Sequence, residues 1–113
     1  MRRLLFNPLA QQPYASGEYN AQNNEFKLDK KLENGHLYYA RIISSTLEAQ
    51  TCCLIDTFKS LYGIKTTPFT FLNNQGFYDA FTGSIVGKSL SIDKDVNTPT
   101  SDEDYIVYIY QLI

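Results

Sequence analysis

The side chains of this chain that could perform chemistry are few, and none stands in a recognisable catalytic pattern. His36 is the one histidine among 113 residues, and it follows the turn signal Asn34-Gly35. A Ser-His-Asp or Cys-His site would need this histidine as its general base. No Gly-x-Ser-x-Gly, phosphate-binding or dinucleotide-binding motif accompanies it. We therefore interpret His36 as a surface residue at the end of a strand, and we expect no catalytic residue and no enzymatic activity.

Acidic side chains gather between residues 93 and 104. Asp93 and Asp95 are separated by one residue, and three acidic residues occupy positions 102–104. Two carboxylates can hydrolyse a glycoside if they face each other across a cleft. Residues 93–97 are loosely similar to a calcium-binding loop, although its glycine and its distal glutamate are missing. A catalytic pair and a calcium site stay open as alternatives, and the expectation is a solvated loop without a metal ion.

Two cysteines, Cys52 and Cys53, are adjacent. A disulfide between neighbours would strain the peptide bond that joins them, and neighbours on a strand point to opposite faces. A zinc site needs about four ligands, and one histidine offers little toward such a set. We expect two reduced thiols, at least one of them in the core, and neither a metal nor a cofactor.

Length, composition and charge restrict the class of protein. A chain of 113 residues with 43% hydrophobic and 19% charged residues predicts one globular domain. The net charge of −2 gives no general attraction to nucleic acid or to an anionic membrane. The lysine pair Lys30-Lys31 is interpreted as part of a solvated face. No apolar stretch reaches the ~20 residues of a membrane helix, and Asn7 and Pro8 interrupt the apolar start too early for a signal peptide. We expect folding in a cytoplasm.

Aromatic and turn-forming residues indicate an all-β fold. The chain has nine Tyr and seven Phe, which favour strands, and Gly, Pro, Asn and Asp recur at the short intervals typical of a sandwich or barrel. Residues 77–87 fit either a helical turn or a strand. Residues 1–24 show neither period and are expected to form an extended N-terminal arm before a β-sandwich domain over 25–113. The expected strands are 25–32, 36–45, 50–57, 68–72, 88–92 and 105–113.

Alternation along these strands predicts the core. The side chains expected there are Tyr39, Ile43, Leu54, Ile55, Leu90, Ile92, Val107 and Ile109.

Two surfaces are candidates for binding. The last strand is apolar on both faces, which indicates a contact surface for a subunit or partner; alternatively, a loop or the N-terminal arm covers it within the monomer. Tyrosines in expected loops could stack on sugar rings, or fill gaps between loops. The candidate assembly contacts are Leu4, Leu5, Phe6, Leu9, Tyr14, Ile106, Tyr108 and Tyr110. The candidate glycan contacts are Tyr19, Tyr62 and Tyr78.

The run Leu-Glu-Asn-Gly-His-Leu-Tyr-Tyr-Ala-Arg-Ile at 32–42 resembles the first core strand of jelly-roll modules in bacteriophage tail, baseplate and fibre proteins, which are similar to carbohydrate-binding domains. Asn7-Pro8 before the core and the final hydrophobic strand match the same layout, but the chain lacks the Trp that such modules often place on a sugar. The resemblance implies a jelly-roll-like β-sandwich and a virion structural or accessory protein (head decoration, head fibre, or tail and baseplate component) assembled in the bacterial host cytoplasm. Its implied partners are other virion proteins and further copies of itself, as a dimer or trimer; the alternative is a module that binds cell-surface glycan.

Overall fold

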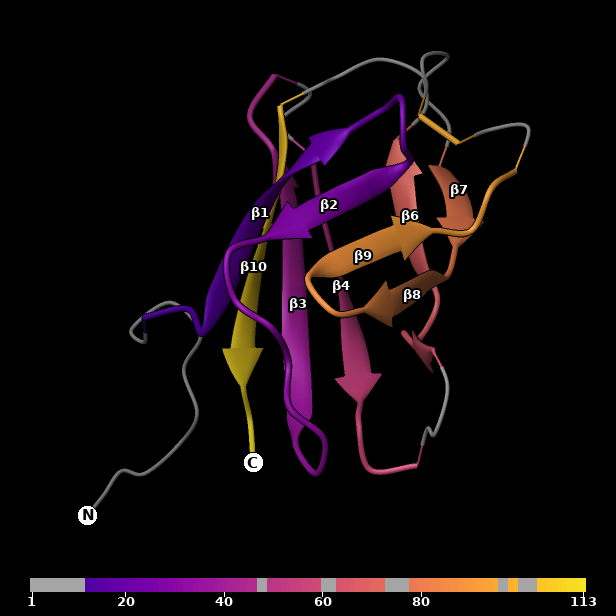
Figure 1. Cartoon of the computed structure of the whole chain (residues 1–113). Helices are drawn as coiled ribbons and strands as arrows, with labels where there is room; N and C mark the ends of the chain where they lie inside the picture. Colours follow the sequence, from indigo (N-terminus) through magenta and orange to yellow (C-terminus); the bar gives the residue numbers. More distant parts are fainter. Residues whose placement is uncertain (1–11, 47–48, 60–62, 73–77, 96–97, 100–103) are drawn as a thin grey trace.

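Short antiparallel strands make up the part of the chain that the computed structural model describes, which is residues 12–46, 49–59, 63–72, 78–95, 98–99 and 104–113 (Figure 1). Turn residues separate the strands, and Gly35 and Gly87 adopt positive φ at two of these turns. The strands are β1 (Ala15–Asn20), β2 (Glu25–Leu28), β3 (Leu37–Ser44), β4 (Ala49–Asp56), β5 (Ile64–Lys65), β6 (Phe69–Leu72), β7 (Tyr78–Phe81), β8 (Gly83–Val86), β9 (Ser89–Ile92) and β10 (Tyr105–Gln111).

Eight strands form one sheet in the order β4-β3-β10-β1-β2-β9-β8-β5, and β6 and β7 form a second, two-stranded sheet. Four pairs of strands are neighbours in sequence: β1 with β2, β3 with β4, β6 with β7, and β8 with β9. The other pairings join distant segments, since β10 lies between β3 and β1, β9 pairs with β2, and β8 pairs with β5. The first and last described strands therefore meet in the middle of the large sheet. This closure depends on pairing between residues some 90 positions apart, such as Ala15 with Ile109.

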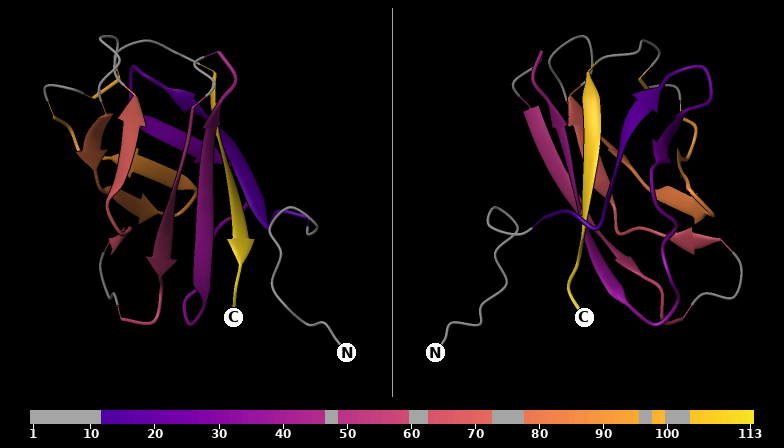
Figure 2. Two further views of the ribbon diagram at one scale, coloured as in Figure 1. Left: turned by 180° about the vertical axis from the view of Figure 1, so that it is seen from behind. Right: turned by 60° about the vertical axis from the view of Figure 1, so that its left-hand side comes forward.

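The large sheet curls until its two edges approach each other. Ile55 of β4 bridges Thr66, which follows β5, and the backbone N–H of Thr67 donates to the carbonyl oxygen of Leu54 at 2.9 Å. Figures 1 and 2 show the strands wrapping around a common interior. The result is a sandwich closed nearly into a barrel, and the predicted all-β, jelly-roll-like fold class is confirmed.

The N-terminal segment differs in part from the prediction. Residues 1–11 lie outside the described residues, but Ala15–Asn20 form β1, which pairs with β10 and β2 instead of belonging to an arm. Strand alternation is present, with Ala15 and Tyr19 buried. Between them stands Gly17, which contributes no apolar side chain, so the period was not visible. A Cβ at Gly17 would collide with the carbonyl oxygen of Lys27 on β2, which explains why this position suits glycine.

Five of the eight predicted core residues are buried, and three are not. Ile55, Leu90, Ile92, Val107 and Ile109 are each at most 3% exposed. The prediction was wrong for Tyr39 and Ile43, which are half-buried, and for Leu54, which is 38% exposed.

Pairing with neighbouring strands explains which face of β3 turns inward. β3 is apolar on both faces, so its own sequence does not choose between them. Ile42 lies opposite Val107 of β10, and the two are buried together, which turns Tyr38, Ala40 and Ile42 inward. On β4 Cys53 and Ile55 face the core, so Leu54 between them faces outward.

The ambiguous segment 77–87 contains strands. Its described part forms β7 and β8. The short strand β5 was also not expected, since it lies in a segment interpreted as a bend. The predicted strand 25–32 ends early, at Leu28, although Leu32 is buried beyond it. Residues 29–36 therefore form a loop between β2 and β3 whose apolar residue points into the core.

Candidate functional site

Two surfaces could bind a partner, and the first is the outward side of three adjacent strands, here called the outer face. Strand register places its side chains in three rows that cross β4, β3 and β10 in turn. The rows are Leu54–Tyr39–Tyr110, Cys52–Arg41–Tyr108 and Gln50–Ile43–Ile106. Except for Tyr110, which is itself buried, these positions alternate with the buried residues of the same strands. The outer face is thus largely apolar and aromatic, with one cation in its middle row.

The side chain of Arg41 is held across the outer face by Gln50. Its Nε and Nη2 atoms donate to Oε1 of Gln50 at 3.1 and 2.9 Å. The rings of Tyr39 and Tyr110 pack with their centroids 6.4 Å apart. Burial, followed by a hydrogen bond with Cys52, raises the pKa of Tyr39, so its hydroxyl stays protonated at neutral pH. The outer face therefore presents ordered groups.

The predicted assembly contacts divide between different places. Ile106 and Tyr108 are half-buried on the outer face, as expected, whereas Tyr110 is only 6% exposed and so is covered within the single chain. Tyr14 lies away from this face, with its ring against that of Tyr38 at 5.3 Å. The other candidates lie outside the described residues; they are Leu4, Leu5, Phe6 and Leu9.

The predicted glycan contacts are not brought together. Tyr19 is buried among Phe26 and Tyr105, with ring centroids 5.2 and 5.9 Å away, and its hydroxyl donates to the carbonyl oxygen of Pro99 at 2.9 Å. Its prediction was wrong because residue 19 is the inward residue of β1, not part of a loop. Tyr62 and the side chain of Tyr78 lie outside the described part of the structure.

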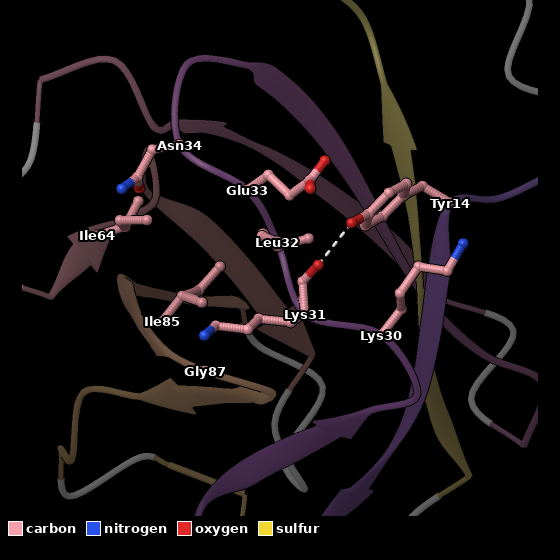
Figure 3. Close-up of a pocket in the computed structure, with 9 residues that line it drawn as sticks. All are labelled: Tyr14, Lys30, Lys31, Leu32, Glu33, Asn34, Ile64, Ile85 and Gly87. Carbon is pink, nitrogen blue, oxygen red and sulfur yellow. Dashed lines mark hydrogen bonds between the residues drawn. The ribbon is translucent and has the colours of Figure 1, made fainter.

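The second surface is a hollow of about 800 Å³ between the β2–β3 loop and the strands β5 and β8 (Figure 3). Residues 30–34 of this loop, here called the lysine loop, form one side of the hollow. Ile64, Ile85 and Gly87 form the opposite side, and Tyr14 closes one end. The volume lies within the usual range for small-ligand sites, about 300–1,000 Å³.

Hydroxyl groups hold the backbone of the lysine loop. Tyr14 Oη donates to the carbonyl oxygen of Lys31 at 2.5 Å, and the buried Tyr38 Oη accepts from the N–H of Glu33 at 3.1 Å. Thr57, also buried, donates from Oγ1 to the carbonyl oxygen of Glu33 at 3.0 Å. Because these three hydroxyl groups hold the backbone, the loop presents its side chains to solvent in a defined arrangement.

The polar side chains of the hollow are divided between its two ends. Figure 3 shows Lys31 extending toward Ile85 and Gly87, with Asn34 close to Ile64 on the same side. Lys30 lies at the other end, with its Nζ 4.7 Å from the centroid of the Tyr14 ring. Burial, with Tyr38 and Glu33 as further causes, raises the pKa of Tyr14, so its hydroxyl remains a donor at neutral pH.

The hollow was not predicted from the sequence. Lys30-Lys31 was interpreted as a solvated face, and both side chains are exposed, but the fold places them on the wall of a concavity. The available signal was a polar run, Lys-Lys-Leu-Glu-Asn-Gly, directly before the clearest strand. Nothing in that run predicts that β5 and β8 lie across from it.

His36 ties together two ends of strands. Its Nδ1 lies 3.1 Å from the carbonyl oxygen of Ile113 and 3.2 Å from Nε2 of Gln111. It sits directly before β3 and is half-buried. The ring therefore connects the end of the chain to the start of β3.

Two described acidic residues of 93–104, Asp93 and Asp104, each accept several hydrogen bonds and so connect separate segments of the chain. Asp93 accepts from the hydroxyls of Thr82 and Ser84 and pairs with Lys65 at 3.3 Å; the hydroxyl of Thr82 is the main cause that lowers the pKa of this carboxyl. Asp104 accepts from Ser44 and from the Thr46 N–H at 3.0 Å, as well as from the hydroxyl of Ser45. Residues 102 and 103 lie outside the description. Among the side chains that the structure places, no group of three or more His, Cys, Asp or Glu could hold a metal ion.

The cysteines point in opposite directions, as strand geometry predicts. Cys52 is exposed on the outer face, whereas Cys53 is 3% exposed in the core, and neither forms a disulfide. Burial is the main cause that raises the pKa of Cys53 to about 12.

Comparisons of this chain with protein-family models, with curated proteins and with solved structures found no match. Within the described ranges no helix is long and apolar enough to cross a membrane.

Proposed function

We propose that this chain is a non-enzymatic assembly subunit that binds a second copy of itself through the outer face. The observation that supports the proposal is the arrangement of Arg41 between Cys52 and Tyr108 on a largely apolar surface of three strands. Aromatic and arginine side chains are enriched where proteins bind one another, and charged residues other than arginine are depleted there.

A two-fold contact suits this surface. In an isologous dimer the same surface of both copies forms the contact. A two-fold axis that passes between Arg41 and Tyr108 in the middle row places each Arg41 over the ring of the other copy's Tyr108. A guanidinium over a tyrosine ring is a favourable cation–π contact. The apolar rows on either side, with Ile43 and Ile106 in one and Leu54 in the other, then exclude water around it.

The first eleven residues supply further apolar groups for such an assembly. They include Leu4, Leu5 and Phe6, and burial of each large apolar side chain contributes ~1.5–3 kcal/mol. The described chain begins beside β10, where the N–H of Tyr14 donates to the carbonyl oxygen of Ile109 at 2.6 Å. Eleven extended residues span up to about 36 Å, enough to reach a neighbouring subunit. The resemblance of residues 32–42 to phage modules suggests a virion as the setting of this assembly.

Sedimentation velocity tests the proposal. The full-length chain is expected to sediment as a dimer or larger oligomer, and Tyr108→Glu to sediment as a monomer. The matched control is Val86→Glu, which places the same charge at a 71% exposed apolar residue away from the outer face and should leave the oligomer intact. A full-length chain that stays monomeric at its highest soluble concentration would refute self-association.

A shortened chain tests the contribution of the first residues. It should begin at Gln12, because a chain that begins at Asn20 would lose most of β1 from the middle of the sheet. We expect the shortened chain to remain folded and to associate more weakly than the full chain. Unchanged association would show that residues 1–11 take no part.

A further inference from the structure

We propose that the hollow beside the lysine loop binds an acidic saccharide, meaning a sugar that carries a carboxylate. The proposal rests on the mixture of groups in the hollow and on the way the fold presents them (Figure 3). It is independent of the assembly proposed above, because the hollow contains none of the outer-face residues.

The charge of the hollow favours an anion. Its lining has two cationic side chains, Lys30 and Lys31, against one anionic side chain, Glu33, although the whole chain carries a net charge of −2. The side chain of Lys31 extends away from Tyr14, toward Ile85 and Gly87 (Figure 3), and no hydrogen bond or ion pair within the described residues occupies its Nζ. A ligand carboxylate can therefore form a charge-assisted hydrogen bond with Lys31.

A simple anion would leave the other polar groups unused. The carboxylate of Glu33 accepts hydrogen bonds and repels a second anion, and the amide of Asn34 both donates and accepts. A ligand that uses all of these groups has an anionic centre and several hydroxyl donors on one small frame. A uronic-acid type of sugar has this combination, and the apolar C–H face of its ring can pack on the aliphatic side chain of Ile64, which removes both from water.

The backbone around the hollow argues against an acidic peptide. An extended peptide binds most readily by adding a strand to a free sheet edge. β8 is already paired on both sides, with β9 and with β5, and directly after β5 Thr66 is bridged to Ile55 of β4. On the opposite wall, backbone groups of Lys31 and Glu33 are bonded to the hydroxyls of Tyr14, Tyr38 and Thr57. Recognition in the hollow thus depends on side chains, which suits a compact polyol.

The fold also keeps the hollow open and prearranged. Gly87 has positive φ, and a Cβ at this position would meet no atom within 4 Å, so the rim is not filled by a neighbour. The three hydroxyl contacts hold the lysine loop before any ligand arrives. Such prearrangement lowers the entropy that binding would otherwise cost.

The test is titration of the full-length chain with tetragalacturonate, followed by amide chemical shifts and calorimetry. We expect the shift changes to concentrate at residues 30–34 and 85–87. Lys31→Gln should weaken binding by about tenfold, the effect of losing one charge-assisted hydrogen bond. Lys94→Gln removes the same charge from an exposed lysine outside the hollow and should leave the affinity unchanged.

Two further ligands, neutral maltotetraose and the acidic peptide tetraglutamate, and one further variant separate the contribution of the carboxylate from that of the sugar. Maltotetraose, a neutral sugar of the same length, should bind more weakly than tetragalacturonate if Lys31 recognises the carboxylate. Asn34→Ala should weaken tetragalacturonate severalfold without any change in charge. The proposal is overturned if tetragalacturonate does not bind, if its shifts lie outside the hollow, if the Lys94 variant loses as much affinity as the Lys31 variant, or if tetraglutamate binds more tightly.

Discussion

The hydroxyl of Tyr14 donates a hydrogen bond of 2.5 Å to the carbonyl oxygen of Lys31, and so joins the segment before β1 to the loop after β2. The two residues are 17 positions apart in the sequence. The same tyrosine carries the ammonium group of Lys30 over its ring. Tyr14 therefore fixes both the backbone of the lysine loop and one of its cations.

Replacement of Tyr14 by Phe removes this hydrogen bond and keeps the ring. We expect a loss of about 1 kcal/mol in the free energy of unfolding, typical of one hydrogen bond, and faster amide hydrogen exchange at residues 30–34. Tyr108→Phe is the matched control, because it removes a tyrosine hydroxyl from the outer face. Equal exchange rates in the lysine loop of wild type and Tyr14→Phe would contradict the role assigned to Tyr14.

Acid should weaken the connection between β10 and the end of β3. The hydroxyl groups of Ser45 and Ser44 and the Thr46 backbone donate to the carboxylate of Asp104, with Ser45 as the main cause, and they lower its pKa below the ordinary value of 3.8. A lowered folded-state pKa means that the stabilisation is fully present above the unfolded value and is lost as the pH falls through the folded value.

Urea unfolding of wild type and Asp104→Asn, at neutral pH and at about pH 3, measures the stabilisation by the Asp104 carboxylate. At about pH 3 the carboxyl of the unfolded chain binds protons, whereas at neutral pH it does not. Wild type should be the more stable protein at neutral pH, and its advantage should shrink in acid. An advantage that does not change with pH would show that the charge of Asp104 contributes nothing.

The two thiols should differ in reactivity. Cys52 is exposed, whereas burial of Cys53 raises its pKa to about 12, and thiols react as thiolates. We expect one thiol per chain to react quickly with an aromatic disulfide reagent in the folded Tyr108→Glu variant, whose outer face is uncovered, and two after denaturation without reductant. Cys52→Ser should abolish the fast phase. If the variant still reacts quickly, Cys53 is not protected by the core.

Replacement of Gly17 by Ala should destabilise the centre of the sheet. The new methyl group would meet the carbonyl oxygen of Lys27 on the neighbouring strand, so the backbone of β1 or β2 would have to shift. Overpacking of this kind costs about 1–3 kcal/mol, measurable by urea denaturation. Ser16→Ala, at the half-buried neighbouring position, should cost much less. Similar losses for both variants would indicate that close packing at Gly17 is unimportant.

Much of the fold could be predicted, because the signals of strands and turns are local. The alternation in 88–92 and 105–113 and the Asn-Gly turn before β3 gave elements that the structure confirms. β1 was missed because Gly17 hides its period, and β5 because two residues carry too short a pattern. The inward face of β3 was predicted wrongly, since Tyr38 and Tyr39 are equally apolar by type.

The sequence by itself determined the fold class and most strand positions, because strand and turn signals are local. It also determined the opposite directions of Cys52 and Cys53, because neighbours on one strand point to opposite faces. Tertiary structure alone decided that Tyr38 rather than Tyr39 faces the core, since the choice depends on pairing with β10 some 65 residues away. It likewise decided that Tyr14, Lys31 and Ile85 line one hollow. A binding surface made by separate segments exists only after long-range strand pairing has closed the sheet.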